Sequence, residues 1–203
     1  MKLLSSLPFL WIAWCAFLLS ACHGDEVAPY PSIITELADC PTDAEGRLTR
    51  IVLDDDTELS VTNIQSGLQS NVCYRALVGY TLEEEGRAKL YSLTGAHILH
   101  DSTFIAPISD PVNVASVWCT ARYLNLHLLP KTKDGQHSYG YVVDSVIDRH
   151  AYLRLHHRQG NDPLAYSTDV YASLPLEELN VDRITFRIPT FKGMHVWEGN
   201  LSR

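Results

Sequence analysis

The chain contains 203 residues, of which 46% are hydrophobic and 20% are charged, and its formal net charge at pH 7 is −8. This apolar content is typical of a globular protein and excludes an intrinsically disordered chain. The negative charge argues against electrostatic binding to nucleic acid or to an anionic lipid surface, because both carry the same sign.

The N-terminal segment, residues 1–21, is predicted to be a lipoprotein signal peptide. Lys2 supplies the positive charge, an apolar run covers residues 7–19, and Leu19-Ser20-Ala21 stands before Cys22. The run is shorter than the ~20 apolar residues that span a bilayer. The last four residues resemble a bacterial lipobox, in which the cysteine after the cut becomes lipidated. We therefore expect Cys22 to carry acyl chains that hold the protein on a membrane.

A lipid anchor of this kind predicts a location in the cell envelope of a diderm bacterium, at the outer membrane. Residues 22–32 are interpreted as a tether, which Pro29 and Pro31 stiffen. Asp25-Glu26 resembles the acidic surface-export signal of some diderm bacteria, but a plain hydrophilic linker fits equally well. Both the periplasmic and the surface face of the membrane therefore stay open.

Residues 33–95 carry the pattern of a small all-β domain. The strand patterns fall at residues 33–39, 48–53, 58–61, 73–82 and 87–93. The acidic turn Asp54-Asp55-Asp56 joins the second and third of them into a hairpin, and residues 83–86 form another turn. Short strands in this order predict an OB-like β-barrel.

Residues 96–111 are interpreted as a connector, and residues 112–203 as a second all-β domain. Its strand patterns fall at residues 112–120, 123–129, 138–147, 150–157, 170–174 and 183–188. The clearest alternation puts Leu124, Leu126 and Leu128 on one face of a strand. Short alternating strands at this spacing predict an immunoglobulin-like β-sandwich, so the whole chain is expected to be all-β.

Three cysteines remain beyond the signal peptide and the lipidated residue, namely Cys40, Cys73 and Cys119. An odd number without a CxxC pair argues against a disulfide scaffold. Cys119 alternates with Val117 and is expected to act as a small buried hydrophobe. A bridge between Cys40 and Cys73 stays an open alternative.

We expect no metal site, no cofactor and no catalytic residue. Asp54-Asp55-Asp56 with Glu58 lacks the sharp-turn glycine of a calcium loop, and a solvated hairpin tip explains these charges. His97 and His100 fall in an extended segment, where residues three apart do not share a face. The sequence contains no Gly-x-Ser-x-Gly elbow, Walker loop or dinucleotide fingerprint. An envelope hydrolase with a scattered active site remains an alternative.

Several motifs in both blocks resemble the NigD-like lipoprotein family. They are Tyr74-Arg75-Ala76-Leu77-Val78, Tyr91-Ser92-Leu93, Val117-Trp118, Arg122-Tyr123-Leu124-Asn125-Leu126, the stretch from His157 to Tyr166, Asp169-Val170-Tyr171 and Leu174-Pro175-Leu176. The resemblance implies an N-terminal OB domain and a C-terminal β-sandwich. The family takes its name from a bacteriocin gene cluster, which suggests a role in immunity or as a secretion accessory. The resemblance implies no active site.

Two groups of residues are candidate ligand contacts. If Leu153 and Leu155 face the core, the alternate side chains of that strand form a cationic and aromatic ridge on its outside. The ridge consists of His150, Tyr152, Arg154, His156 and Arg158. The second group is Asn161 and Asp162 in the Gly160–Pro163 turn, since loops on rigid scaffolds carry function. Ordinary strand and turn positions would explain the same residues without any ligand.

The sequence therefore predicts a non-catalytic envelope lipoprotein that binds a protein, a peptide or a glycan. Aromatic and arginine side chains stack on sugar rings and hold phosphate or carboxylate groups, which is why the ridge favours such partners. No nucleic-acid partner is expected. Roles in bacteriocin immunity or secretion remain alternatives to this interpretation.

Overall fold

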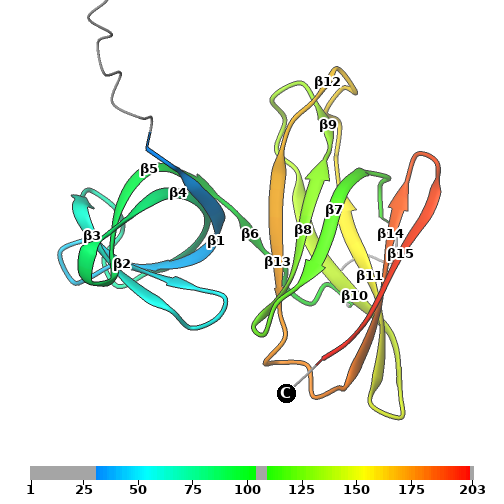
Figure 1. The fold of residues 1–203 in the computed structure, drawn as a ribbon. Coiled ribbons are helices and arrows are strands. Elements are labelled where there is room, and N and C mark those ends of the chain that lie inside the picture. The colour runs from blue at the N-terminus through cyan, green and yellow to red at the C-terminus, as the bar shows by residue number, and fades with distance from the viewer. Residues whose placement is uncertain (1–30, 104–108, 202–203) are drawn as a thin grey trace, which may run out of the picture. The chain divides into compact units, whose positions relative to one another are not determined.

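The computed structural model describes residues 31–103 and 109–201 of the chain (Figure 1). The predicted signal peptide and Cys22 lie outside these residues. From Ile33 onward the chain forms one compact unit. Within the described residues the regular secondary structure is β-strand apart from one 3-10 turn at Glu84–Gly86, which confirms the all-β prediction. No described helix is long and apolar enough to cross a membrane.

The first block is a closed five-stranded barrel, drawn in blue to green in Figure 1. Its strands are β1 (Ile34–Pro41), β2 (Leu48–Leu53), β3 (Glu58–Gln65), β4 (Cys73–Glu83) and β5 (Arg87–Gly95). They follow the order β1-β2-β3-β5-β4, and β4 closes the barrel by pairing antiparallel with β1. This closed order confirms the predicted OB-like barrel.

The second block contains two four-stranded sheets. One sheet has the order β10 (Ser138–Ile147), β11 (His150–Arg158), β14 (Arg183–Thr190) and β15 (Gly193–Asn200). The other has the order β6 (His97–Ile98), β13 (Val170–Pro175), β8 (Tyr123–Leu129) and β7 (Asn113–Cys119). A separate two-stranded ribbon pairs β9 (Lys131–Thr132) with β12 (Tyr166–Ser167). The predicted β-sandwich is therefore present.

The two sheets share one hydrophobic core, built from the side chains that the alternation predicts. Leu124, Leu126 and Leu128 of β8 are fully buried, as are Leu153 of β11 and Phe186 of β14. Removing one such side chain from water contributes about 1.5–3 kcal/mol. The strand register inferred from the sequence is therefore correct for these strands.

Four strands, β6, β9, β12 and β15, were not expected from the sequence, and β6 and β15 show why. His97 and Ile98 lie in the expected connector, yet they pair in parallel with β13 as strand β6, and the next residue, Leu99, is buried. Strand β15 was not predicted, because Met194 and Val196 are exposed and the strand shows little hydrophobic alternation. Neither strand has an alternating pattern in the sequence, so each is recognised only by the strand with which it pairs.

The cysteines do not form a bridge in the described part of the chain. Cys40, Cys73 and Cys119 are free thiols. In the β1–β4 pair, Cys40 lies opposite Tyr74 and Cys73 lies opposite Pro41, so the two thiols point to opposite sides of the barrel wall. Burial raises the pKa of the Cys40 thiol to about 12, which makes it unreactive.

Candidate functional site

The most deeply buried charge in the described residues belongs to Arg75 of β4, whose side chain is 1% exposed. Its Nη1 lies 2.7 Å from Oδ1 of Asp54 and 3.2 Å from Oδ1 of Asp39. Its Nε donates to Oγ of Ser173 on β13 at 3.1 Å, and its guanidinium carbon lies 3.9 Å from the ring centre of Tyr123. The guanidinium is therefore paired both to carboxylates of the barrel and to groups of the sheets.

Polar side chains on β8 and just before it complete the group around this guanidinium. We name this group the Arg75 cluster; it consists of Arg75, Asp39, Asp54, Arg122, Tyr123, Asn125 and Ser173. Asn125 is fully buried, accepts from Nη2 of Arg75 at 3.2 Å and donates to Oδ2 of Asp54 at 3.0 Å. The Tyr123 hydroxyl donates to Asp39 at 3.0 Å, and Nη2 of Arg122 lies 2.7 Å from the same carboxylate. Burial, followed by the charge of Asp39, raises the pKa of Tyr123 to about 12.

This cluster sets two guanidinium groups, Arg75 and Arg122, against three carboxylates, its own Asp39 and Asp54 and the exposed Asp56 beside it. Buried charges cost several kcal/mol each unless they are paired and hydrogen-bonded. The strands that hold the buried groups come from the barrel and from the sheet of β8 and β13, so the cluster joins the two blocks. Its role is to fix the junction.

The sequence motifs around Arg75 and Asn125 resemble family motifs, but sequence reasoning did not predict that these two residues meet. They are 50 positions apart. A signal was nevertheless present, since Asp39 stands between Ala38 and Cys40 and Arg75 directly precedes the apolar run Ala76-Leu77-Val78. Charges in such strands are rarely buried unless they are paired.

Asp162, a predicted ligand contact, is instead engaged by its own sandwich. Its carboxylate accepts hydrogen bonds from the Thr132 hydroxyl, from the backbone N–H of Lys133 at 3.0 Å and from Nε2 of His137 at 3.0 Å. The Thr132 hydrogen bond, together with the others, lowers the pKa of Asp162. A Cβ on Gly135 would stand 2.3 Å from Cγ of Asp162, so the loop approaches this glycine too closely for any side chain. The neighbouring Asn161 is exposed.

A hydrogen-bonded chain runs from Asp162 through two histidines. Nδ1 of His137 lies 3.0 Å from Nε2 of His157, and Nδ1 of His157 lies 3.1 Å from the carbonyl oxygen of Asp110. We name Asp162, His137 and His157 the histidine relay. The two ends of the relay, a carboxylate and a carbonyl, only accept hydrogen bonds.

Burial lowers the pKa of His157 to about 4, which keeps this ring neutral, with its proton on Nδ1 toward Asp110. A ring with its proton on Nδ1 offers Nε2 as the acceptor on the side of His137. The relay therefore ties the Asp162 loop to the strand that carries His157 through hydrogen bonds within the sandwich.

Beside the relay lies a cavity of about 340 Å³. Its lining includes His97, His137, Tyr139 and Thr168. The Tyr139 ring stacks on His157 with centroids 5.1 Å apart and an interplanar angle of 12°. Among the described residues, no group of three or more His, Cys, Asp or Glu side chains is placed to hold a metal ion. The cavity offers aromatic faces to a bound group, and the relay behind it is internally satisfied.

The predicted ridge on β11 is partly present. His150 and Tyr152 stack on the outer face of the strand with ring centroids 4.2 Å apart. Arg154 pairs with Asp144 at 3.0 Å, and Arg158 is exposed at the end of the strand. Sequence reasoning missed Arg187 of β14, which lies beside Arg154 in the register and 5.9 Å from the Tyr152 ring centre.

The prediction that His156 points into solvent is wrong, since this residue is only 7% exposed. Its direct neighbour across the strand pair is Gly140. A Cβ on Gly140 would stand 2.3 Å from Oγ of Ser102 and 2.8 Å from the carbonyl oxygen of His100. The chain at these two residues therefore covers that end of the face. We name His150, Tyr152 and Arg154 of the predicted ridge, together with Arg187, the outer ridge.

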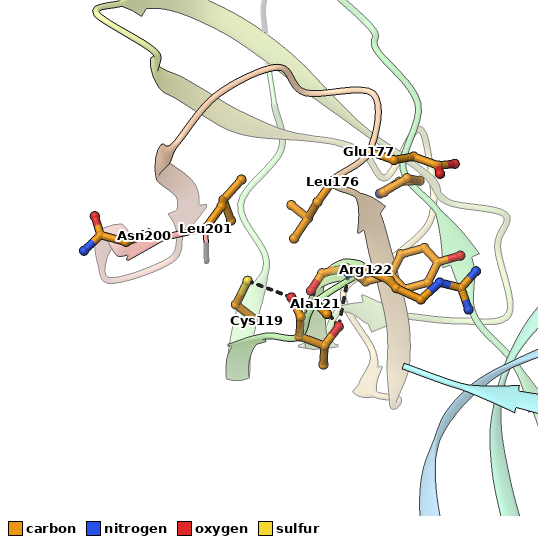
Figure 2. Close-up of a pocket in the computed structure, with 10 residues that line it drawn as sticks. Cys119, Ala121, Arg122, Leu176, Glu177, Asn200 and Leu201 are labelled. Atoms are coloured by element: carbon orange, nitrogen blue, oxygen red, sulfur yellow. Dashed lines mark hydrogen bonds between the residues drawn. The ribbon is translucent and has the colours of Figure 1, made fainter. Parts of the chain in front are cut away.

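A larger cavity of about 610 Å³ opens where β7 and β8 meet the end of β15 (Figure 2). Cys119, Leu176 and Leu201 surround its apolar part, and Glu177 and Asn200 lie at its polar margin. Figure 2 shows the Arg122 guanidinium directed away from Cys119 and Leu201. The cationic group next to this cavity is therefore committed to the Arg75 cluster.

The comparisons with known proteins identify the sandwich. The family model described as the NigD-like C-terminal beta sandwich domain matches residues 103–196. No curated protein matches the sequence. Solved structures match in 13 chains. Three that cover both blocks of this chain are described below.

A NigD-like immunity protein from Bacteroides caccae is 24% identical, with a TM-score of 0.64 over 84% of this chain and 93% of that chain. A protein of unknown function from Bacteroides vulgatus is 16% identical, with a TM-score of 0.67 over 85% and 92%. A "Putative lipoprotein" from Bacteroides fragilis is 13% identical, with a TM-score of 0.63 over 85% and 99%. These likenesses show a shared fold. The family resemblance rests on the family model, which matches the sandwich over residues 103–196 as a NigD-like C-terminal beta sandwich domain and so confirms the predicted resemblance to the NigD-like family.

Proposed function

We propose that this chain is a lipid-anchored protein of the cell envelope that binds a protein, a peptide or a glycan without catalysing a reaction. The anchor is supported by the lipobox that ends at Cys22 and by the Bacteroides fragilis neighbour, which bears a lipoprotein name. Two or more acyl chains give stable attachment, whereas one chain binds only marginally. The outer membrane of a diderm bacterium is the proposed location.

The hydrogen-bond partner of Nδ1 of His137 favours a binding function over hydrolysis. An Asp–His pair becomes a hydrolase dyad when the second ring nitrogen accepts the proton of a nucleophile. In this chain Nε2 of His137 meets Asp162, but Nδ1 meets His157 at a hydrogen-bonding distance of 3.0 Å. The position that a serine or threonine hydroxyl would take is therefore filled by a neutral imidazole. This single contact carries the choice of a binding protein over the alternative of an envelope hydrolase.

The outer ridge is the proposed ligand-binding face. Tyr152 presents an aromatic ring between His150 and Arg187, an arrangement that stacks on sugars or on planar groups. Arg154 lies beside Arg187 in the register, so two guanidinium groups meet on this face, where Arg154 pairs with Asp144 and Glu198 accepts from Thr185. An anionic glycan or an acidic protein surface fits this chemistry. Arg158 and the exposed Asn161 are proposed as contacts at the margin.

The anchor is tested by replacing Cys22 with alanine. The variant should lose labelling by a radioactive or alkyne-tagged fatty acid and should appear in the soluble fraction. A Cys73→Ala variant is the matched control, because its thiol is exposed and lies in the barrel. Membrane retention of the Cys22 variant at the level of the control would contradict the proposal.

The binding face is tested with a glycan array and an envelope pull-down, in which the wild type is compared with a Tyr152→Ala, Arg187→Ala double variant. Arg50→Ala serves as a control on the barrel, where its ion pair with Glu58 is about half exposed. Binding should fall in the double variant and should weaken with salt, because exposed charges are screened beyond ~8 Å at physiological ionic strength. Retention of every partner by the double variant would show that the ridge is an ordinary solvated face.

A role in immunity is the second candidate, and the name of the Bacteroides caccae neighbour favours it. Cells that produce the chain would survive a bacteriocin that kills cells without it. The Cys22→Ala variant, released from the membrane, would lose this protection. Equal killing of producing and non-producing cells would leave the binding role and remove the immunity role.

A further inference from the structure

Strand β15 is an unprotected edge of the sheet β10-β11-β14-β15. Along one side it pairs with β14 over its whole length, from Gly193 to Asn200. Within the described residues no strand pairs with its other side. The strand contains no proline, and Met194 and Val196 are 52% and 48% exposed. Long apolar edges of this kind recruit a further strand unless something blocks them.

The opposite edge of the same sheet, β10, is covered by the chain itself. The backbone N–H of Ser102 donates to the carbonyl of Tyr141 at 2.7 Å, and the N–H of Tyr141 donates to the carbonyl of His100 at 2.9 Å. The N–H of Val143 donates to the Thr103 hydroxyl at 3.0 Å. One edge is thus closed within the chain, and the other is left with its hydrogen-bonding groups available.

The backbone groups that β15 offers can be assigned from its pairing with β14. The N–H of Leu201 donates to the carbonyl of Asp182, which makes this a hydrogen-bonded pair. Hydrogen-bonded and non-hydrogen-bonded pairs alternate along an antiparallel ladder, so odd-numbered residues of β15 bond to β14. The N–H and C=O groups of Met194, Val196 and Glu198 therefore point to the free edge.

We propose that this edge is a docking surface for a second copy of the chain, joined by antiparallel pairing of β15 with β15 around His195. In this symmetric register Met194 lies opposite Val196 of the second copy, and Lys192, in the turn just before β15, lies at the end of the ladder beside Glu198 of the second copy. Each contact occurs twice, so two apolar pairs are flanked by two pairs of opposite charge. The pairs that carry the side-chain contacts are also the pairs whose backbone groups point to the free edge.

The neighbouring symmetric register is less complementary. Centred on Val196, it would place Met194 opposite Glu198 and His195 opposite Trp197. Apolar and opposite-charge cross-strand pairs each stabilise a sheet, whereas an apolar side chain opposite a carboxylate does not. The charges therefore select the register on His195, and they select a strand identical to β15 over an unrelated one.

The first test uses disulfide trapping in membranes that contain the full-length protein. A His195→Cys change is made in a Cys73→Ser, Cys119→Ser background, and the membranes are treated with a mild oxidant. The proposed register brings residue 195 of both copies directly opposite each other, within the Cα separation that a disulfide spans. A covalent dimer should form with this variant and not with Lys89→Cys on the barrel. Equal yields from both variants, or adducts to other proteins in place of the dimer, would overturn the proposal.

The second test reverses the charges in the same trapped variant. Lys192→Glu and Glu198→Lys should each lower the yield of dimer roughly tenfold, because two attractive pairs become repulsive. A mixture of the two single variants restores opposite charges at both pairs and should recover the yield as a mixed dimer. Both substitutions lie at exposed positions, so folding should be unchanged. Unchanged yields, or no recovery in the mixture, would overturn the register.

Discussion

The Arg75 cluster and the histidine relay are both buried polar groups, but they depend on the solvent in different ways. The Arg75 cluster is held by guanidinium groups, which stay charged at every physiological pH, and it joins strands of the barrel to strands of the sandwich. The relay contains two imidazole rings, of which His157 has its pKa lowered by burial to about 4, and it fixes a loop within the sandwich. The comparison indicates that the junction is built to be permanent, whereas the loop is held by a group that acid and base can change.

The largest expected effect comes from removing the charge at the junction. Arg75→Leu leaves Asp39 and Asp54 buried without their main partner, which should lower the free energy of unfolding by about 3–5 kcal/mol. Urea unfolding followed by circular dichroism measures this change. Arg50→Leu, in an exposed ion pair with Glu58, should cost no more than about 1 kcal/mol. Similar losses in both variants would remove the distinction between buried and exposed pairs.

Acid should weaken the relay before it affects the junction. The pKa of His157 is lowered to about 4 in the folded chain, against 6.5 for an ordinary histidine. Between these values the unfolded chain binds more protons, so the free energy of unfolding falls as the pH falls from 6.5 to 4, by up to about 3 kcal/mol.

The free energy of unfolding is then measured between pH 6.5 and pH 4 in two variants, to show which group causes its fall in acid. His157→Gln should flatten the slope between pH 6.5 and pH 4, because the titrating group is gone. Arg50→Leu, which breaks an exposed ion pair, should keep the slope. A slope that survives in the His157 variant would mean that another group titrates in this range.

A smaller loss of stability is expected when a side chain is added at Gly135, which the Asp162 loop approaches closely. Gly135→Ala places a Cβ against the Asp162 carboxylate, so the loop must shift, at a cost of about 1–3 kcal/mol. Gly95→Ala is the matched control, since no atom lies within 4 Å of its added Cβ and its φ is not in the left-handed region. Thermal unfolding compares the two. If both melt at the same temperature, the close approach of Asp162 to residue 135 is not a constraint.

The smallest effect is expected on the outer ridge. Arg154→Ala breaks a partly exposed pair with Asp144 and should change the free energy of unfolding by no more than about 1 kcal/mol. Leu153→Ala on the same strand should cost about 2–5 kcal/mol, because its side chain is fully buried. Chemical denaturation of both variants tests whether the alternation along β11 is as described.

Strand patterns in the sequence predicted most of the fold because burial alternates strictly in its central strands. The spacing of Leu124, Leu126 and Leu128 predicts strand β8, and similar apolar spacing predicts the strands of the barrel. Strand β15 escaped notice because it is an edge strand and its exposed residues include apolar ones. A two-residue strand such as β6 has no period at all, so only its partner β13 defines it.

The candidate sites were harder to predict because they depend on distant pairs. The turn containing Asp162 was identified from its composition, yet its carboxylate contacts Thr132 and His137, which lie 30 and 25 positions earlier. Alternation alone places His156 on an outer face, and it cannot show that the chain near Ser102 covers that face. Local sequence fixes which way a side chain points, and long-range packing decides what it meets.

The free thiols of the barrel have a consequence for how this protein matures. Cys40 and Cys73 lie on adjacent strands but face opposite sides of the barrel wall, and no cystine links the described strands. The antiparallel pairing of β1 with β4 therefore needs no oxidation step, since neither of these two thiols is consumed when the strands come together.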